Sequence, residues 1–197
     1  MAARSVPATV AAGRGTKSAI RDAAVKLFGD KGFEQTSLRE VADAVGITKA
    51  SLYYHYASKL DLLHAIIDPI IDHLRSVVVD LDRTPHDADG IRYVLRSYLR
   101  GMVHHRDAGA LVLRDTVTIV NAVADRHPDL VDDDQALREW LAGPEPTDEA
   151  KLRASAALAM LGVALMSKEF APGADDALVE ATLLDAATCV LTPLRSA

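Results

Sequence analysis

Hydrophobic and polar residues repeat with a helical period along this chain. Between Gln35 and Leu63 the apolar residues recur three or four positions apart, which places them on one face of an α-helix. The pattern predicts two short helices joined by a tight turn, followed by the start of a longer helix. Elsewhere almost no alternation of β-branched residues appears, so the sequence predicts an all-α fold of about nine helices.

Residues that favour helix ends mark the limits of the short helices. Ser37 is a good N-cap, and Glu40 three positions later completes a capping box. Gly46 is expected to end the first helix, because glycine tolerates the left-handed backbone of a tight turn. Thr48 is expected to cap the second helix and Ser58 the third.

Two helices joined by a short turn that contains glycine have the form of a helix-turn-helix. In that motif the second helix lies in the major groove of DNA. Leu52 and Tyr56 define the inner face of the second helix here. Lysine can donate to guanine, serine suits several bases, and tyrosine hydroxyls reach phosphates. Side chains of these kinds are expected outside, with one small residue: Lys49, Ala50, Ser51, Tyr53 and Tyr54.

An ordinary helical bundle is the alternative interpretation of this stretch. In that case Tyr53, Tyr54 and Tyr56 would all pack into the core. Three aromatic residues so close together cannot all face one side of a helix, so at least one is expected at the surface. An exposed aromatic side chain beside others usually has a partner.

The remaining helices are separated by stretches rich in glycine, proline and aspartate. Pro69 lies inside one of them, where it removes a backbone hydrogen bond and should kink the helix. The kink fits a hinge and a static bend equally well. The expected helices span about residues 17–30, 59–79, 91–105, 108–126, 132–142, 148–170 and 174–194.

Composition restricts the cellular setting and the function. The chain has 197 residues, of which 49% are hydrophobic, enough for a sizeable core. Its single cysteine, Cys189, excludes an internal disulfide and a cysteine-based zinc site and fits a reducing, cytoplasmic compartment. No apolar stretch reaches the length needed to span a membrane. Residues 1–60 hold nine basic and five acidic residues, whereas the rest is acidic, which suits local DNA contact by one small domain.

Sequence motifs for catalysis are not apparent. The chain has no HExxH, no glycine-rich phosphate loop and no GxSxG. The sequence therefore indicates no catalytic residues, no metal site and no cofactor, and the protein is expected not to be an enzyme.

Residues 17–63 resemble the DNA-binding domain of the TetR family of bacterial transcriptional regulators. The resemblance rests on Ala23-Ala24, Leu27-Phe28 and Gly32-Phe33, then on residues 36–46. Its strongest part is TKASLYYHY, residues 48–56, with Lys59 and Leu62-Leu63 after it. The family usually has phenylalanine where Tyr56 stands, so a hydroxyl here needs a partner. About a quarter of the chain is covered.

The resemblance implies roles for individual residues. Lys49 and Ala50 are at positions that read bases, with Thr48 and Ser51 beside them. Ser37, or Thr36 before it, is where a helix N-terminus meets a phosphate, and such an end also attracts anions by its free N–H groups and dipole. The expected phosphate contacts are Tyr53, Tyr54, His55 and Lys59.

Residues 1–15 are mostly small, with glycine, proline and arginine, and are expected to form a disordered arm. The resemblance implies a helix-turn-helix domain (16–60) and a ligand-binding and dimerisation domain (61–197). In the family the last two helices form a four-helix bundle with a second copy. The alternative is that both helices are internal to a monomer. The expected dimer residues are Ala159, Gly162, Val163, Val179, Leu183, Ala187, Val190 and Leu194.

The function expected from this resemblance is that of a homodimeric repressor, released from a palindromic operator in double-stranded DNA by a small apolar effector. One alternative is a helical small-molecule-binding protein or enzyme whose helix-turn-helix no longer binds DNA. Another is a structural module that uses its C-terminal helices alone. The expected effector pocket is mostly apolar, with Ile67, Tyr93, Tyr98, Met102, Arg114, Thr116 and Leu161 as lining residues.

Overall fold

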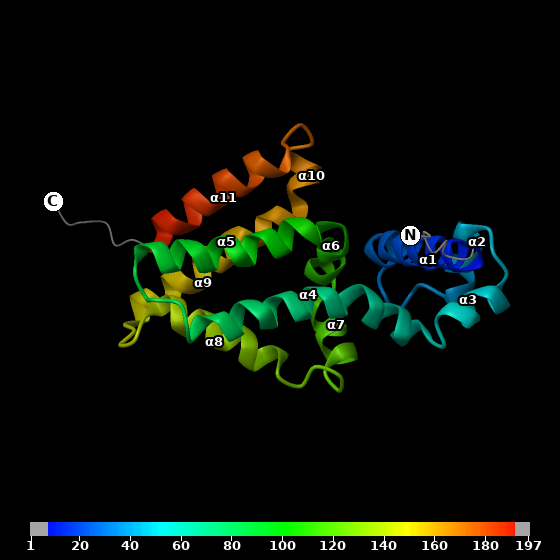
Figure 1. The fold of residues 1–197 in the computed structure, drawn as a ribbon, viewed down its shortest axis with the longest axis horizontal. Helices are drawn as coiled ribbons and strands as arrows, with labels where there is room; N and C mark the ends of the chain where they lie inside the picture. The colour runs from blue at the N-terminus through cyan, green and yellow to red at the C-terminus, as the bar shows by residue number, and fades with distance from the viewer. Residues whose placement is uncertain (1–7, 192–197) are drawn as a thin grey trace, which may run out of the picture. The chain divides into compact units, whose positions relative to one another are not determined.

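The computed structural model describes residues 8–191, and these residues form helices and loops without a strand (Figure 1). The all-α prediction is confirmed. The elements are α1 (Ala8–Lys31), α2 (Leu38–Val45), α3 (Lys49–His55), α4 (Lys59–Leu81), α5 (Ala88–His104), α6 (Arg106–Arg114), α7 (Thr116–Val123), α8 (Leu130–Ala142), α9 (Asp148–Gly162), the 3₁₀ helix η1 (Val163–Met166), α10 (Ser167–Phe170) and α11 (Asp176–Leu191).

The first helix begins earlier than its apolar pattern predicts. It starts at Ala8 rather than near Lys17, so residues 8–15 of the expected arm are helical. The alanines of this segment favour helix. Residues 1–7 of the expected arm lie outside the described residues.

Local interactions at the helix ends follow the predicted capping. Ser37 and Glu40 form the expected capping box, in which the backbone N–H of Ser37 donates to Glu40 Oε2 at 2.8 Å. Gly46 adopts a left-handed conformation with φ 73°. Thr48 accepts from the backbone N–H of Ser51 at 3.1 Å and starts α3. Ser58 accepts from the N–H of Asp61 at 3.0 Å and starts α4. The turn between α2 and α3 is therefore determined by local sequence.

Two helices that were expected to be continuous are each divided, which explains why the helix labels run beyond nine. The expected helix over 108–126 breaks at Asp115 between α6 and α7. There the hydroxyl of Thr116 donates to the carbonyl of Val112 at 2.6 Å, and such a bond competes with regular helix geometry. The expected helix over 148–170 tightens into η1, where Ser167 donates to the carbonyl of Ala164 at 2.8 Å.

The described chain divides into two compact units. The N-terminal unit contains residues 8–67 together with Leu111–Val123, and the C-terminal unit contains Asp68–Ala110 and residues 124–191. The first unit thus includes the start of α4 and all of α7, beyond the boundary at residue 60 expected from the sequence. In its core, α1, α2, α3 and α4 contribute residues such as Phe28, Val41, Leu52 and Leu62, all fully buried.

The C-terminal unit is organised around α9. This helix packs against α8, α11 and α5, and α11 lies along both α9 and α5 (Figure 1). Leu95, Leu99, Leu137 and Leu161 are fully buried in the shared core. Residues Asp148–Glu169 are the one stretch of the described chain long and apolar enough to cross a membrane, a test that core helices of soluble proteins also pass.

Candidate nucleic-acid interface

Helix α3 has one buried and one exposed face. Leu52 is fully buried, and Tyr56, which follows the helix, is 5% exposed. On the other side Tyr53 is 45% exposed and Tyr54 is 87% exposed. The interpretation in which all three tyrosines pack into a core therefore does not hold.

The exposed face of α3 presents hydrogen-bond donors of several kinds. Lys49 and Ala50 are exposed in the first turn. The Lys49 ammonium lies 5.6 Å from the ring centroid of Tyr53, close enough for a cation–π attraction that favours an extended lysine. The rings of Tyr54 and His55 meet edge to face, with centroids 5.3 Å apart. A cation, two phenols and an imidazole thus lie on one short helix.

The N-terminus of α2 carries its own anion, the carboxylate of Glu40. This carboxylate accepts from Lys31 Nζ at 2.6 Å and from both the backbone N–H and the hydroxyl of Ser37. These hydrogen bonds, that of Lys31 first, lower the pKa of Glu40 to about 2. Ser37 remains exposed, so it is accessible to a phosphate, but its N–H is already engaged by Glu40.

Thr36 is placed inside the N-terminal unit. It is 1% exposed, and its hydroxyl lies 2.9 Å from the carbonyl oxygen of Gly32 and 3.2 Å from that of Leu27. It therefore satisfies carbonyl groups at the end of α1. Of the two residues predicted from sequence for the phosphate at this helix end, Ser37 is the accessible one.

Lys59 also makes internal contacts. Its ammonium donates to the backbone carbonyls of Phe33 and Glu34, at 2.9 and 3.1 Å. It also lies 4.5 Å from the ring centroid of Phe33. The sequence suggested that the Lys59 ammonium contacts a phosphate. In the structure this ammonium instead contacts the segment that follows α1.

Arg39 is a candidate that the sequence reasoning missed. It lies in the first turn of α2, its side chain is 80% exposed, and its nearest acidic partner is Asp43 at 3.8 Å. A basic residue just inside a capped helix start was visible in the sequence, beside Leu38. Helix N-termini attract anions, so Arg39 adds an exposed cation to the phosphate site expected there.

The residues expected to line an effector pocket are divided between the two units. Ile67, Arg114 and Thr116 belong to the N-terminal unit, where Arg114 donates to the carbonyl of Gly29 on α1. In the C-terminal unit Leu161 is fully buried and Met102 is partly buried against the core. Burial, followed by the nearby Asp134, raises the pKa of Tyr98 to about 12.

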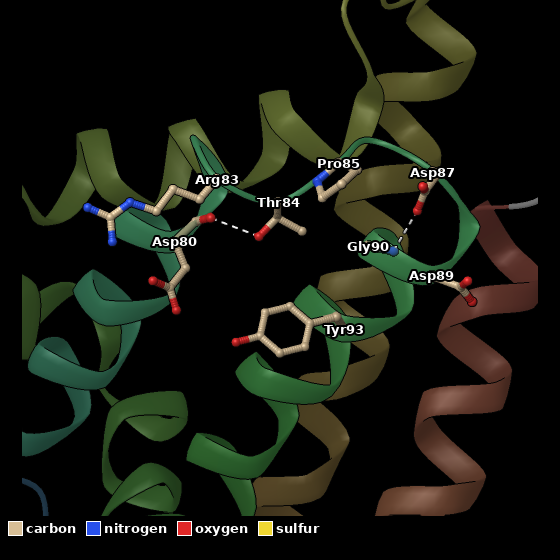
Figure 2. A pocket seen from close by; sticks show the side chains of 8 residues that line it. All are labelled: Asp80, Arg83, Thr84, Pro85, Asp87, Asp89, Gly90 and Tyr93. Atoms are coloured by element: carbon tan, nitrogen blue, oxygen red, sulfur yellow. Dashed lines mark hydrogen bonds between the residues drawn. The ribbon is translucent and has the colours of Figure 1, made fainter.

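Tyr93 lines a cavity of about 460 Å³ at the junction of α4 and α5. Figure 2 shows its ring beside the loop that joins the two helices. The hydroxyl of Thr84 there donates to the carbonyl of Asp80, and Asp87 caps α5 by accepting from the N–H of Gly90. Tyr93 is the one residue of the expected effector pocket among those that line this cavity, which are Asp80, Arg83, Thr84, Pro85, Asp87, Asp89, Gly90 and Tyr93.

The residues expected at a dimer interface face two directions. Val179 and Ala187 of α11 are buried within their own unit, and Leu183 and Val190 pack against the same core. Ala159 and Val163 are exposed and Gly162 is half-buried, whereas Leu194 lies outside the described residues. The exposed apolar surface instead includes Leu152, 72% exposed, and Leu178, 57% exposed. Among the described residues expected at the interface, Ala159 and Val163 are therefore the ones exposed in the single chain.

Comparison with known proteins agrees with this geometry. Residues 20–66 match the family described as "Bacterial regulatory proteins, tetR family". The biofilm operon icaADBC HTH-type negative transcriptional regulator IcaR of Staphylococcus aureus (strain Newman) is 38% identical over 63 residues, which are 32% of this chain and 34% of that protein. The match thus spans about a third of the length of that relative.

Solved structures extend the similarity beyond the N-terminal unit. AmtR of Mycobacterium smegmatis is 25% identical with a TM-score of 0.68, over 87% of this chain and 84% of that one. The ketosteroid transcriptional regulator KstR2 of Mycobacterium tuberculosis is 17% identical with a TM-score of 0.69, over 89% and 92%, which shows a common fold. These findings show that residues 20–66 form a helix-turn-helix domain of the TetR family of bacterial regulatory proteins, and that the chain shares its fold with known transcriptional regulators.

Proposed function

We propose that the protein is a sequence-specific DNA-binding transcriptional regulator that acts as a homodimeric repressor in the cytoplasm. The observation that carries the proposal is the exposed face of α3, where Lys49, Tyr53 and Tyr54 project from a helix anchored by the buried Leu52. Without a polyanionic partner, such a gathering of exposed aromatic and cationic side chains would lack a physical reason.

On DNA, the start of α3 would enter the major groove. Lys49 would donate to base edges, for which guanine O6 and N7 are the preferred acceptors, and Ala50 allows close approach. Tyr53, Tyr54 and His55 would contact phosphates and hold the helix in register. The hydroxyl of Thr48 accepts from the backbone N–H of Ser51, and both residues belong to the first turn that would enter the groove. Ser37 and Arg39 would meet a phosphate at the start of α2.

Two copies would join through the exposed apolar face of α9 and α11. Leu152, Ala156, Ala159 and Val163 follow one another at spacings of four, three and four along α9 and its extension, and all four are exposed. Such spacing places side chains on a single helix face. A two-fold dimer would carry two recognition helices about 34–36 Å apart, which suits a palindromic operator read in successive major grooves.

A small apolar effector bound in the C-terminal unit would release the repressor. Release requires only that the effector bind the DNA-incompetent conformation more tightly than the competent one. Tyr98 and Met102 on α5 remain the candidate contacts, because both pack against the core and are only partly buried. Leu161 and Ile67 are packed inside their units, so an effector would have to displace neighbouring side chains to reach them.

Selection of bound fragments from random duplex DNA, at a fixed salt concentration, tests the proposal. The wild-type protein should enrich a palindrome with half-sites about one helical turn apart. Lys49→Ala should change the preferred bases, whereas the control Lys151→Ala, an exposed lysine of α9, should leave them unchanged. Enrichment of no sequence by the wild-type protein would contradict the proposal and favour a helical ligand-binding protein whose helix-turn-helix no longer binds DNA.

A further inference from the structure

The corner between α3 and α4 is bonded to α1 at one point and to the segment that follows α1 at another. At one point the hydroxyl of Tyr56 donates to the carbonyl of Lys17, 3.3 Å away. At the other the ammonium of Lys59 donates to the carbonyls of Phe33 and Glu34. Tyr56 directly follows α3 and Lys59 opens α4, so both ties act at the C-terminal end of the recognition helix.

We propose that Lys59 is a positioning residue for DNA binding, which fixes the orientation of α3 from inside the protein instead of contacting a phosphate. This inference rests on the function proposed above. A lysine ammonium has three N–H donors, and two of them are engaged by the two carbonyls at 2.9 and 3.1 Å. The centroid of the Phe33 ring lies 4.5 Å from the ammonium, close enough for a cation–π attraction.

The segment that Lys59 contacts has carbonyl groups that need donors. It leaves α1 between Gly32 and Thr36, outside any helix. Thr36 supplies a hydroxyl to the carbonyl of Gly32, and the N–H of Thr36 donates to the carbonyl of Phe33. Lys59 supplies the donor to Glu34 and a second donor to Phe33. Since backbone carbonyls in folded proteins are almost always paired, Lys59 has a structural task independent of DNA.

Lys49, in the same helix-turn-helix, is accessible to DNA in a way that Lys59 is not. It is exposed, and among the described residues no carboxylate or backbone carbonyl is recorded as its hydrogen-bond partner, only the Tyr53 ring at 5.6 Å. Lys59 is half-buried and held by three groups. α3 has only seven residues, so a shift at its end would move every side chain that faces the groove.

The test compares Lys59→Met with the wild-type protein on a duplex selected by the wild-type protein. Binding is measured at several salt concentrations and at a temperature where circular dichroism shows both proteins fully folded. We expect Lys59→Met to weaken binding about tenfold and to leave the slope of log K against log salt unchanged. A slope reduced by about one unit would mean a lost phosphate contact and would overturn the inference.

A second variant separates positioning from general stability. Phe33→Leu removes the ring beneath the ammonium and leaves the residues of the exposed α3 face unchanged. It should reproduce the loss of affinity at unchanged slope, and the double variant should lose less than both single losses combined, because the two residues act as one contact. Unchanged affinity in folded Lys59→Met would leave Lys59 a stability residue only and overturn the inference. A wild-type protein that binds no duplex would overturn the proposed function and this inference with it.

Discussion

The hydroxyl of Tyr56 donates a hydrogen bond to the backbone carbonyl of Lys17, although 39 positions separate the two residues in the chain. The ammonium of Lys17 in turn lies 5.4 Å from the centroid of the Tyr56 ring. Burial, more than neighbouring charges, raises the pKa of Tyr56. One side chain thus packs the end of α3 into the core and joins it to α1 by a polar contact.

Tyr56→Phe should remove this polar contact and keep the packing. We expect a loss of about 0.5–1.5 kcal/mol in the free energy of unfolding, the usual net value of one hydrogen bond. Urea denaturation measures it. Tyr54→Phe is the matched control, because that ring is 87% exposed and its variant should unfold at the same urea concentration. A Tyr56→Phe protein as stable as wild type would show that the hydroxyl contributes no net stabilisation.

Two glycines should respond to alanine in opposite directions. Gly46 has a φ of 73°, so Gly46→Ala should destabilise the protein by roughly 1–2 kcal/mol because a side chain is strained there. Gly29 lies within α1, and a Cβ there would meet no atom within 4 Å. Gly29→Ala should stabilise by roughly 0.5–1 kcal/mol. The melting temperatures of the two variants, measured beside that of the wild type, show whether each substitution stabilises or destabilises the protein.

Glu40 should make stability depend on acid pH. Its pKa is lowered from 4.5 to about 2 by Lys31 and Ser37, so the folded state holds the carboxylate more strongly than the unfolded state does. The contribution is complete above pH 4.5 and is lost as the pH falls towards 2. Glu40→Gln should therefore lower the melting temperature at neutral pH and approach wild type near pH 2. A constant difference between the two proteins across this range would contradict the linkage.

Leu152 should be essential for dimerisation. Replacing it with glutamate places a charge on the exposed apolar face of α9 in both copies, and the dimer dissociation constant should rise roughly a hundredfold. Sedimentation velocity over a concentration series measures the change. Val131→Glu, at a position of α8 that is 66% exposed, is the control and should leave the association unaltered. Wild-type protein that sediments as a monomer at every concentration would argue against a homodimer.

Asp68 joins α4 to the segment before α8. It accepts from Nε2 of His127 at 2.8 Å and pairs with Arg126 at 3.0 Å, and His127 is 6% exposed. Asp68→Ala would leave the buried His127 without this partner, at a cost of about 1–3 kcal/mol. Asp72→Ala, one turn later and 68% exposed, should cost far less. Equal urea midpoints for the two variants would refute this assignment.

The sequence predicted best where structure is decided locally. The caps at Ser37, Thr48 and Ser58 and the left-handed Gly46 appear as expected, because each depends on residues within three or four positions. The break at Asp115 and the 3₁₀ turn of η1 were missed. Both interrupt apolar runs whose periodicity alone favours a continuous helix, and the deciding bonds are made by single hydroxyls of Thr116 and Ser167.

Site residues divide in the same way. The exposure of Tyr53 and Tyr54 was predictable, because helical spacing places them away from the face on which Leu52 is buried. The internal placement of Thr36 and Lys59 depends on carbonyl groups of α1 and the segment after it, which periodicity cannot locate. The burial of Val179 and Ala187 within their own unit was not predictable either, because an apolar stripe on a helix can face its own core or a second copy.

The crossing of α4 and α5 in the C-terminal unit has a consequence for sequence variation among relatives. A Cβ at Gly101 would collide with the ring of His73, and that ring is fixed by a hydrogen bond between its Nε2 and the carbonyl of Ser97 at 2.9 Å. Turning the ring away would break this bond. Positions 73 and 101 should therefore covary: a larger residue at 101 is expected only in relatives that carry a smaller one at 73.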